Sequence, residues 1–319
     1  MSHNKQMRWK VLISSAHMQS RLEKYRELLR QNDIEVEIIS RPQFVPEGDF
    51  LDIIEPFHAV VCSDDEITER VLERAKNLKV ISKWGVGINS INLGAAKRLG
   101  IAVHNSPGAF SESCATMIFS YILHFARFVA RQDETVRQGE WEHAPGISLA
   151  GKTIGIIGIG NIGREVAKRA AAFDMKIFGC DIKPIDREAL ETYSIIMTSK
   201  DDLLRNSDFV VLAPDLNETS FHLIGAPELS IMKPTAYLFN TSRGPVVDEA
   251  ALIEALQTKK IAGAGLDVFE VEPLPADSPL REMDNVILTP HNAYNTEEAE
   301  DFVHDNTIKN LVEALKKLI

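Results

Sequence analysis

Short apolar runs alternate with helical segments along almost the whole chain of 319 residues. The runs are rich in Val, Ile and Leu, and each ends at polar or turn-forming residues. Strands that are buried on both faces have this composition, and the helical segments between them suit the crossovers that parallel strands require. The sequence therefore predicts an α/β protein whose parallel sheets are covered by helices.

The first series of runs predicts one α/β unit in residues 1–104. Its expected strands are WKVLISS (9–15), EVEIIS (35–40), AVVCSD (59–64), LKVISKWG (78–85) and IAVHNS (101–106). A turn-rich joint, NSPGAFSES (105–113), follows the last of them. One long helix with much apolar surface is then expected over residues 113–141. It needs more than one partner, so it either crosses between domains or packs against a second subunit.

The second series begins near Leu149 and has the same alternating pattern. Its expected strands are KTIGIIGIG (152–160), MKIFGCD (175–181), YSIIMTS (193–199), DFVVLAP (208–214), AYLFNTS (236–242), IAGAGLDV (261–268) and NVILTP (285–290). A final helix over residues 296–318 is expected to return to the first unit, because the sequence shows no third domain for it to join.

Composition narrows the classes of partner. The net charge is −11 and the pI is about 5.4, which argues against a nucleic-acid surface or an acidic membrane as a partner. The N-terminus lacks the apolar core and cleavage site of a signal peptide. The three cysteines, Cys62, Cys114 and Cys180, are scattered and lack metal-ligand spacing. We therefore expect a cytoplasmic protein with reduced thiols, no metal site and a small-molecule substrate.

A glycine-rich loop predicts a dinucleotide site. Gly158, Gly160 and Gly163 form a G-x-G-x-x-G motif that directly follows an apolar run and opens a helical segment. These glycines allow a tight turn and a close approach of pyrophosphate, and the helix N-terminus presents free N–H groups to it. Asp181 ends the next expected strand, where an acid accepts hydrogen bonds from ribose hydroxyls. It therefore favours NAD over NADP, although Lys183 nearby weakens the argument.

Polar residues follow three further expected strands, and the carboxyl ends of these strands should meet at one edge of the sheet. Arg243 precedes Gly244-Pro245, and an immobilised guanidinium suits bidentate binding of a carboxylate. His291 follows Thr289-Pro290, and histidine exchanges protons near neutral pH. A carboxylate on its far nitrogen would fix the tautomer and raise the basicity. Asp267, Glu270 and Glu272 are the candidates for that carboxylate.

The series of motifs resembles the D-isomer-specific 2-hydroxyacid dehydrogenases, which include glyoxylate and hydroxypyruvate reductases, 3-phosphoglycerate dehydrogenases and D-lactate dehydrogenases. The resemblance covers nearly the whole chain. It is carried by KWGVGINSIN (83–92), NSPG (105–108), GIGNIG (158–163), NTSRGPVVDEAAL (240–252), GLDVFEVEPLP (265–275) and TPH (289–291). The order Arg243, Glu272, His291 is the order in which the family carries its reacting groups.

The resemblance implies specific roles. Arg243 binds the carboxylate and keto oxygen of the substrate, Glu272 pairs with the imidazole, and His291 exchanges the proton as hydride moves to or from NAD. Val86 and Gly87 would give backbone N–H groups to the carboxylate, and Lys83 either meets an extra anionic group or is solvated. The implied cofactor contacts are Gly158, Gly160, Asn161, Ile162, Gly163, Asp181, Pro214, Thr241, Ser242 and Asp267.

The resemblance also implies two Rossmann- or flavodoxin-like domains with a cleft between them. The substrate domain would comprise residues 1–104 with 291–319, the NAD-binding domain would comprise residues 105–290, and the protein would be a homodimer. The chain departs from the family pattern at Asn89, Ser90, Asn92, Thr116 and Asn292. These departures bear on the substrate and the loop geometry, and leave the three reacting groups in place.

Two other functions remain as hypotheses. An NAD(H)-sensing binding protein on the same scaffold would bind NADH tightly without turning over a keto acid. Oxidation of phosphite would use a triad closely similar to Arg243, Glu272 and His291. Formate oxidation is disfavoured, because the formate enzymes that this family includes typically carry glutamine where Glu272 stands.

Overall fold

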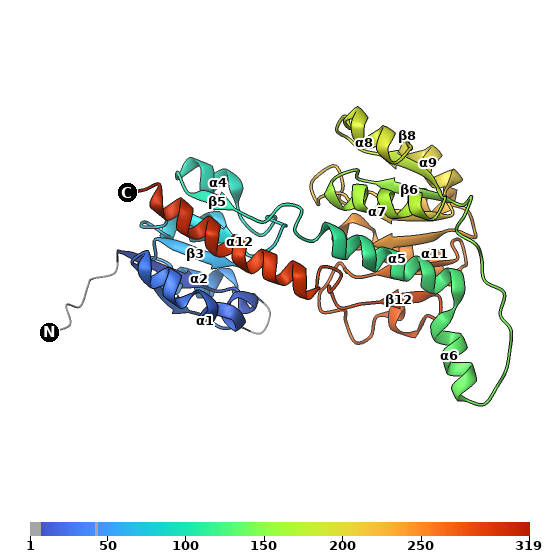
Figure 1. Ribbon diagram of the computed structural model, residues 1–319, viewed down its shortest axis with the longest axis horizontal. Helices are drawn as coiled ribbons and strands as arrows, with labels where there is room; N and C mark the ends of the chain where they lie inside the picture. Colours follow the sequence, from blue (N-terminus) through green and yellow to red (C-terminus); the bar gives the residue numbers. More distant parts are fainter. Residues whose placement is uncertain (1–7, 42–43) are drawn as a thin grey trace. The chain divides into compact units, whose positions relative to one another are not determined.

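The computed structural model describes residues 8–41 and 44–319, which form two compact units (Figure 1). Unit 1 runs as far as Phe110 and resumes at Thr296, and unit 2 comprises Ser111–Asn295. Each unit is built around one parallel sheet, as the alternating apolar runs predict.

The sheet of unit 1 has five parallel strands in the order β2-β1-β3-β4-β5. The strands are β1 (Trp9–Ile13), β2 (Ile34–Ile38), β3 (Ala59–Cys62), β4 (Val80–Lys83) and β5 (Ala102–His104). All five lie within the predicted runs or extend one by a single residue. This is the flavodoxin-like order, in which all strands are parallel and the strand order reverses between β1 and β3.

Helices cover both faces of that sheet. They are α1 (Ala16–Gln31), α2 (Glu47–Ile53), α3 (Glu69–Arg74), α4 (Leu93–Arg98) and α12 (Glu297–Lys316). The short helices α2, α3 and α4 share one core with alternate residues of the sheet, such as Leu12, Val60 and Ile81. Helix α12 packs against β3, β4 and β5, and the Ser82 hydroxyl donates to the Thr307 carbonyl oxygen at 2.8 Å. The chain's end therefore returns to unit 1, as predicted.

The sheet of unit 2 has seven parallel strands in the order β12-β11-β10-β9-β6-β7-β8. The strands are β6 (Thr153–Ile157), β7 (Lys176–Cys180), β8 (Ile195–Met197), β9 (Phe209–Leu212), β10 (Tyr237–Asn240), β11 (Gly263–Leu266) and β12 (Val286–Leu288). Each lies within a predicted run. The strand order reverses between β6 and β9, which is the position at which Rossmann sheets bind dinucleotides.

Two helical layers sandwich this sheet. The helices are α5 (Ser111–Arg127), α6 (Val129–Arg137), α7 (Asn161–Ala172), α8 (Arg187–Thr192), α9 (Lys200–Asn206), α10 (Ala226–Ile231) and α11 (Glu249–Gln257), with 3-10 turns η1 (Gly244–Val246) and η2 (Pro279–Glu282). Successive side chains of a strand point to opposite faces of the sheet, so the core of unit 2 has two parts, one on each face. Ile156 and Val211 face α5 and α7, whereas Val210 and Leu212 face α9, α10 and α11.

The prediction of one long helix over residues 113–141 is wrong in two respects. The helix breaks at Phe128, whose φ of 52° is left-handed, and α5 and α6 meet at a bend of 56°. Residues 138–148 lie outside any helix or strand. The break is supported from outside the helix, because Ile147 N–H donates to the Ala126 carbonyl oxygen at 2.9 Å. Among the described residues, no single helix is long and apolar enough to cross a membrane.

Candidate active site

The glycine-rich loop lies where β6 ends and α7 begins. Gly158 has a φ of 94°, and a Cβ on it would come within 2.6 to 2.7 Å of the backbone of Ala213 and Pro214 after β9. Gly160 is the N-cap of α7, and a Cβ on it would meet nothing within 4 Å. Asn161 and Ile162 form the first turn of the helix. The loop thus leaves open space in front of a helix N-terminus, as a pyrophosphate requires.

Asp181 follows β7 and holds the same loop. Its two carboxylate oxygens accept from Ile159 N–H at 2.7 Å and from Lys183 N–H at 2.8 Å. The side chain is therefore fixed beside the glycine loop by backbone donors on both sides. A fixed carboxylate in this place can accept from ribose hydroxyls and repels a 2′-phosphate.

The end of β10 brings two further predicted contacts to the edge of the sheet. The Ser242 hydroxyl donates to Asn240 Oδ1 at 2.8 Å, so Asn240 holds it. Thr241 is 7% exposed, and among the described residues its buried Oγ1 has no hydrogen-bond partner. An orphaned buried hydroxyl is rare, and an amide such as that of nicotinamide would satisfy it. The described residues thus fit NAD.

Arg243 is fixed at the start of a tight turn. Asn240 Nδ2 donates to its carbonyl oxygen at 2.9 Å, and a Cβ on the next residue, Gly244, would lie 1.8 Å from the Phe269 carbonyl oxygen. The turn therefore packs directly on the segment that carries Glu272. The guanidinium donates from Nη1 to the Ser242 carbonyl oxygen at 2.7 Å, and within the described ranges its other N–H groups have no acceptor. They remain able to bind an anion.

His291 and Glu272 form a hydrogen-bonded pair. His291 Nδ1 donates to Glu272 Oε2 at 2.7 Å, and Glu272 Oε1 accepts from Phe269 N–H at 3.0 Å. Burial acts to lower the pKa of His291, but the hydrogen bond and charge of Glu272 outweigh it and raise that pKa. Burial acts in turn to raise the pKa of Glu272, and His291 holds it below its ordinary value. The pair thus favours an imidazolium beside a carboxylate.

Glu270 lies elsewhere, since its Oε1 is 2.6 Å from His222 Nε2. The charges of Arg243 and Asp267 also act on His291, in opposite directions. Unit 2 therefore contains Arg243, Glu272 and His291, and its boundary at Asn295 lies four residues after the last of them.

Asp267 is 1% exposed, and it anchors the loop that carries His291. Its carboxylate accepts from the Thr289 hydroxyl at 2.5 Å, from Asn292 N–H at 2.8 Å and from Ala293 N–H at 2.9 Å. Its carbonyl oxygen accepts from His291 N–H at 2.8 Å. Holding the His291 loop is therefore a structural role of Asp267 that the sequence does not reveal. The resemblance implies a direct contact with nicotinamide in addition.

The predicted carboxylate loop of unit 1 follows β4. Gly85 has a φ of 119°, and Asn105 Nδ2 donates to the Val86 carbonyl oxygen at 2.6 Å. Lys83 is 3% exposed, and its Nζ donates to Asp64 Oδ1 at 3.0 Å, so the side chain is not freely solvated. The unusual Asn92 has a local explanation, because its side chain caps α4 by accepting from Ala95 N–H at 2.9 Å.

The sequence analysis assigns no role to four residues that hold these groups in place, and only two of the four lie in a motif. Thr289 belongs to the TPH motif, which gives a signal for it, and Asn240 begins the NTSRG motif. Asp64, the partner of Lys83, has no motif. Tyr121 on α5, which contacts Thr289, lies in an ordinary apolar stretch.

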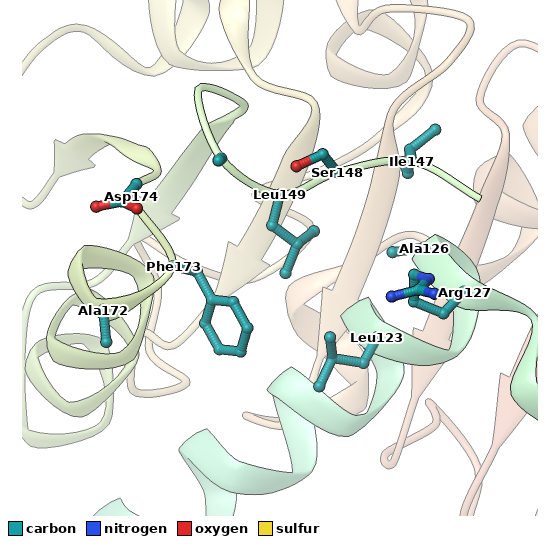
Figure 2. Close-up of a pocket in the computed structure, with 10 residues that line it drawn as sticks. Leu123, Ala126, Arg127, Ile147, Ser148, Leu149, Ala172, Phe173 and Asp174 are labelled. Carbon is teal, nitrogen blue, oxygen red and sulfur yellow. The ribbon is translucent and has the colours of Figure 1, made fainter.

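A pocket of about 320 Å³ lies away from these residues, and Figure 2 shows Leu123, Leu149 and Phe173 directed toward it. It is lined by the C-terminal ends of α5 and α7 and by residues 147–150. The glycine loop stands at the other end of α7. The pocket is therefore separate from the candidate site.

Comparison with known proteins gives the class. Residues 119–293 match the family described as D-isomer specific 2-hydroxyacid dehydrogenase, NAD binding domain. The chain is 39% identical over 290 residues to the glyoxylate reductase of Thermococcus litoralis, covering 87% of this chain and 86% of that one. It is 39% identical over 297 residues to the hydroxypyruvate reductase of Thermotoga maritima, covering 89% and 92%.

Among solved structures, D-lactate dehydrogenase from Aquifex aeolicus, complexed with NAD and lactic acid, superposes with a TM-score of 0.85. The two chains are 31% identical, with 97% of this chain and 95% of that one covered. The chain belongs to the D-isomer specific 2-hydroxyacid dehydrogenases. It is an NAD-dependent oxidoreductase of that family.

Proposed function

We propose that this protein reduces a 2-keto acid to a D-2-hydroxy acid, and catalyses the reverse oxidation, with His291 as the proton donor and acceptor. The observation that carries the proposal is the His291–Glu272 pair with the guanidinium of Arg243 near it, which uses only Nη1 in a hydrogen bond within the described part of the protein. When bound, the nicotinamide supplies or accepts the hydride at the keto carbon. The chain's own residues must then bind the acid and move one proton.

His291 suits the proton transfer because its two nitrogens have different surroundings. Nδ1–H donates to Glu272, which leaves Nε2 for the substrate oxygen. In the imidazolium form Nε2–H donates a proton to the developing alkoxide, and in the neutral form Nε2 accepts the hydroxyl proton in the reverse direction. Glu272 stabilises the imidazolium that exists before reduction.

Arg243 supplies the anchor for the acid. Its fork can bind a carboxylate through two parallel hydrogen bonds and polarise the adjacent keto oxygen. The proposal adds backbone N–H groups of Val86 and Gly87 as further donors to the carboxylate, and assigns unit 1 to the substrate and unit 2 to NAD. The glycine loop, Pro214, Thr241, Ser242 and Asp267 are the proposed cofactor contacts.

The test is consumption of NADH by the purified protein with glyoxylate, hydroxypyruvate, its 3-phosphate, pyruvate and longer 2-keto acids. Turnover of at least one acid, with a D-configured product on chiral chromatography, is the expected result. Tight NADH binding with no turnover of any acid would favour the sensing hypothesis. Reduction of NAD by phosphite, in the absence of any keto acid turnover, would favour the phosphite reaction.

A Glu272→Gln protein is expected to shift the pH dependence of turnover. Reduction requires the imidazolium, so its kcat falls as the pH rises through the pKa of His291. Glu272 raises that pKa, and its neutral replacement therefore moves the fall in reductive kcat to lower pH. Oxidation, which needs the neutral imidazole, should extend to lower pH in the same variant. Steady-state kcat measured against pH in both directions reports both limbs.

Glu270→Gln is the matched control, because Glu270 lies two residues away and pairs with His222 instead. Its pH profile should coincide with that of the native protein. A Glu272→Gln profile whose limbs stay in place would contradict the role of Glu272.

We also propose that the protein is a homodimer and that the arm formed by residues 129–147 contacts the second copy. Helix α6 has no buried residue, and Figure 1 shows it extending away from the sheet of unit 2. The arm exposes Val129, Val136, Trp141 and Ile147, with Trp141 at 79%. Isolated helices shorter than about 12–15 residues are marginal in water, so an unsupported α6 needs a partner. A second copy is the commonest such partner.

Replacing Val136 and Trp141 together by Glu is expected to convert the dimer to a monomer, because two charges would be buried in an apolar contact. Light scattering coupled to gel filtration measures the mass. Leu28→Glu, which introduces a charge at an exposed apolar position of α1, is the control and should leave the mass unchanged. A native protein that already elutes as a monomer would contradict the proposal.

A further inference from the structure

Two hydroxyl groups, one on buried Tyr121 and one on half-buried Thr289, link α5 to the loop that carries His291. The Tyr121 hydroxyl is hydrogen-bonded to Thr289 Oγ1, and Thr289 Oγ1 donates to Asp267 Oδ1. Tyr121 is 3% exposed, and burial raises the pKa of its hydroxyl. The family motifs do not include Tyr121, and none of the roles assigned above needs it.

The direction of these hydrogen bonds follows from the groups involved. An ionised carboxylate only accepts, so the single hydroxyl proton of Thr289 goes to Asp267. Thr289 Oγ1 can then only accept from Tyr121, whose hydroxyl proton is used in turn. Each of these hydroxyl groups therefore has one defined orientation, and removing the Tyr121 hydroxyl leaves the half-buried Thr289 Oγ1 without its donor.

The packing around the tyrosine ring serves this contact. A Cβ on Gly265 in β11 would lie 2.8 Å from Tyr121 Cδ2 and 2.9 Å from Cγ, so only glycine lets the ring lie this close to the strand. The ring also stacks on Phe239 of β10, with 6.4 Å between centroids. The ring is thus held against the sheet, with its hydroxyl at the end of β12.

This series of hydrogen bonds ends at the loop that carries His291. Asp267 accepts three hydrogen bonds from Thr289, Asn292 and Ala293, which flank the histidine on both sides. His291 itself has a left-handed φ of 51°. Such a conformation is costly for a residue other than glycine, and it persists only where its surroundings hold it.

We propose that Tyr121 is a positioning residue for His291, and that it acts through Thr289 and the Asp267 carboxylate. The proposal rests on the proposed function, in which His291 transfers the proton. Tyr121 keeps Thr289 directed at Asp267, and Asp267 keeps the loop from Thr289 to Ala293 in the conformation that places the imidazole beside Glu272. Tyr121 does not touch substrate or cofactor in this account.

The kinetic test is a cycle of two substitutions. Tyr121→Phe should lower kcat about threefold to tenfold, the scale of one buried hydrogen bond, with little change in the KM of the keto acid or of NADH. Thr289→Val should lower kcat further, and Thr289→Ser, which keeps the hydroxyl, should restore most of it. Because Tyr121 acts only through Thr289, the double variant with Val at 289 should match Thr289→Val alone. Effects that multiply in the double variant would overturn the proposal.

Tyr237→Phe is the matched control. Tyr237 is a half-buried tyrosine of the same unit, stacked on Phe125, and no hydrogen bond to its hydroxyl is found among the described residues. Its loss of a hydroxyl should leave kcat unchanged. A loss equal to that of Tyr121→Phe would mean that the effect is general packing, which would also overturn the proposal.

A second measurement separates this proposal from the proposed function. Amide hydrogen exchange at Asn292 and Ala293 should be faster in Tyr121→Phe than in the native protein, with Tyr237→Phe as the same control. If the native protein turns over no keto acid, the proposed function fails, and faster exchange would still support the positioning of the loop by Tyr121. Unchanged exchange at both amides would overturn the proposal whatever the activity.

Discussion

A His291→Asn protein is expected to lose about 10³-fold or more in kcat for the reduction of its keto acid, the scale of a general acid together with its orientation. Asparagine is the replacement of choice because His291 has a left-handed φ of 51°, and asparagine adopts that region more readily than most residues. The loop can then keep its conformation while the group that donates the proton is lost. Binding of NADH, measured by fluorescence, should stay near that of the native protein.

The structure offers a closely matched control for this variant. His222 also lies in unit 2, also has a left-handed φ, of 47°, and also pairs its imidazole with a glutamate, Glu270. His222→Asn should therefore reproduce the structural change without the chemical one and retain most of the native kcat. Near-native turnover in His291→Asn would refute the proposed proton donor. Equal losses in both variants would attribute the effect to the backbone.

An Arg243→Lys protein is expected to lose roughly 10²- to 10³-fold in kcat/KM for the keto acid, because two charge-assisted hydrogen bonds are replaced by at most one. Lysine keeps the positive charge but lacks the planar fork that matches a carboxylate. Most of the loss should fall on the KM of the keto acid, with a smaller fall in kcat from weaker polarisation of the keto oxygen. The Kd of NADH should change little.

Arg205→Lys, at an exposed position of α9, tests whether an arginine-to-lysine exchange in unit 2 matters in general, and its kinetics should be native. A sharper test adds guanidinium to an Arg243→Ala protein. Partial recovery of turnover would show that the planar cation itself is what the reaction needs. A KM that is unchanged in Arg243→Lys would contradict the binding of the carboxylate by Arg243.

The strands could be predicted from the sequence because a buried parallel strand needs an apolar run and little else. Each of the strands β1 to β12 lies at a predicted run, including short ones such as β8. The break at Phe128 could not be predicted in this way. Its left-handed conformation is supported by residues 146 and 147, and nothing within the helical stretch itself marks the point where they contact it.

The residues of the candidate site also differ in whether the sequence predicts them. Arg243 and His291 stand at the ends of strands, so an edge shared by parallel strands is enough to bring them together. The choice of Glu272 over Glu270 needed the family pattern, since both acids lie in one turn and only the fold shows that Glu270 pairs with His222. Neither the strand pattern nor the family pattern predicts a role for Tyr121. Its contact with Thr289 depends on which face of α5 meets β11 and on the missing side chain of Gly265.

One consequence follows from the place of the boundary at Asn295. The glycine loop and all three proposed reacting groups are encoded in one uninterrupted stretch of the chain, from Ser111 to that boundary. Duplication and recombination could therefore transmit the hydride chemistry as a single genetic block. Under the proposed function, unit 1 binds the acid, so the segments that build it can diverge separately. Directed evolution of new acid specificities should therefore begin with libraries in those segments.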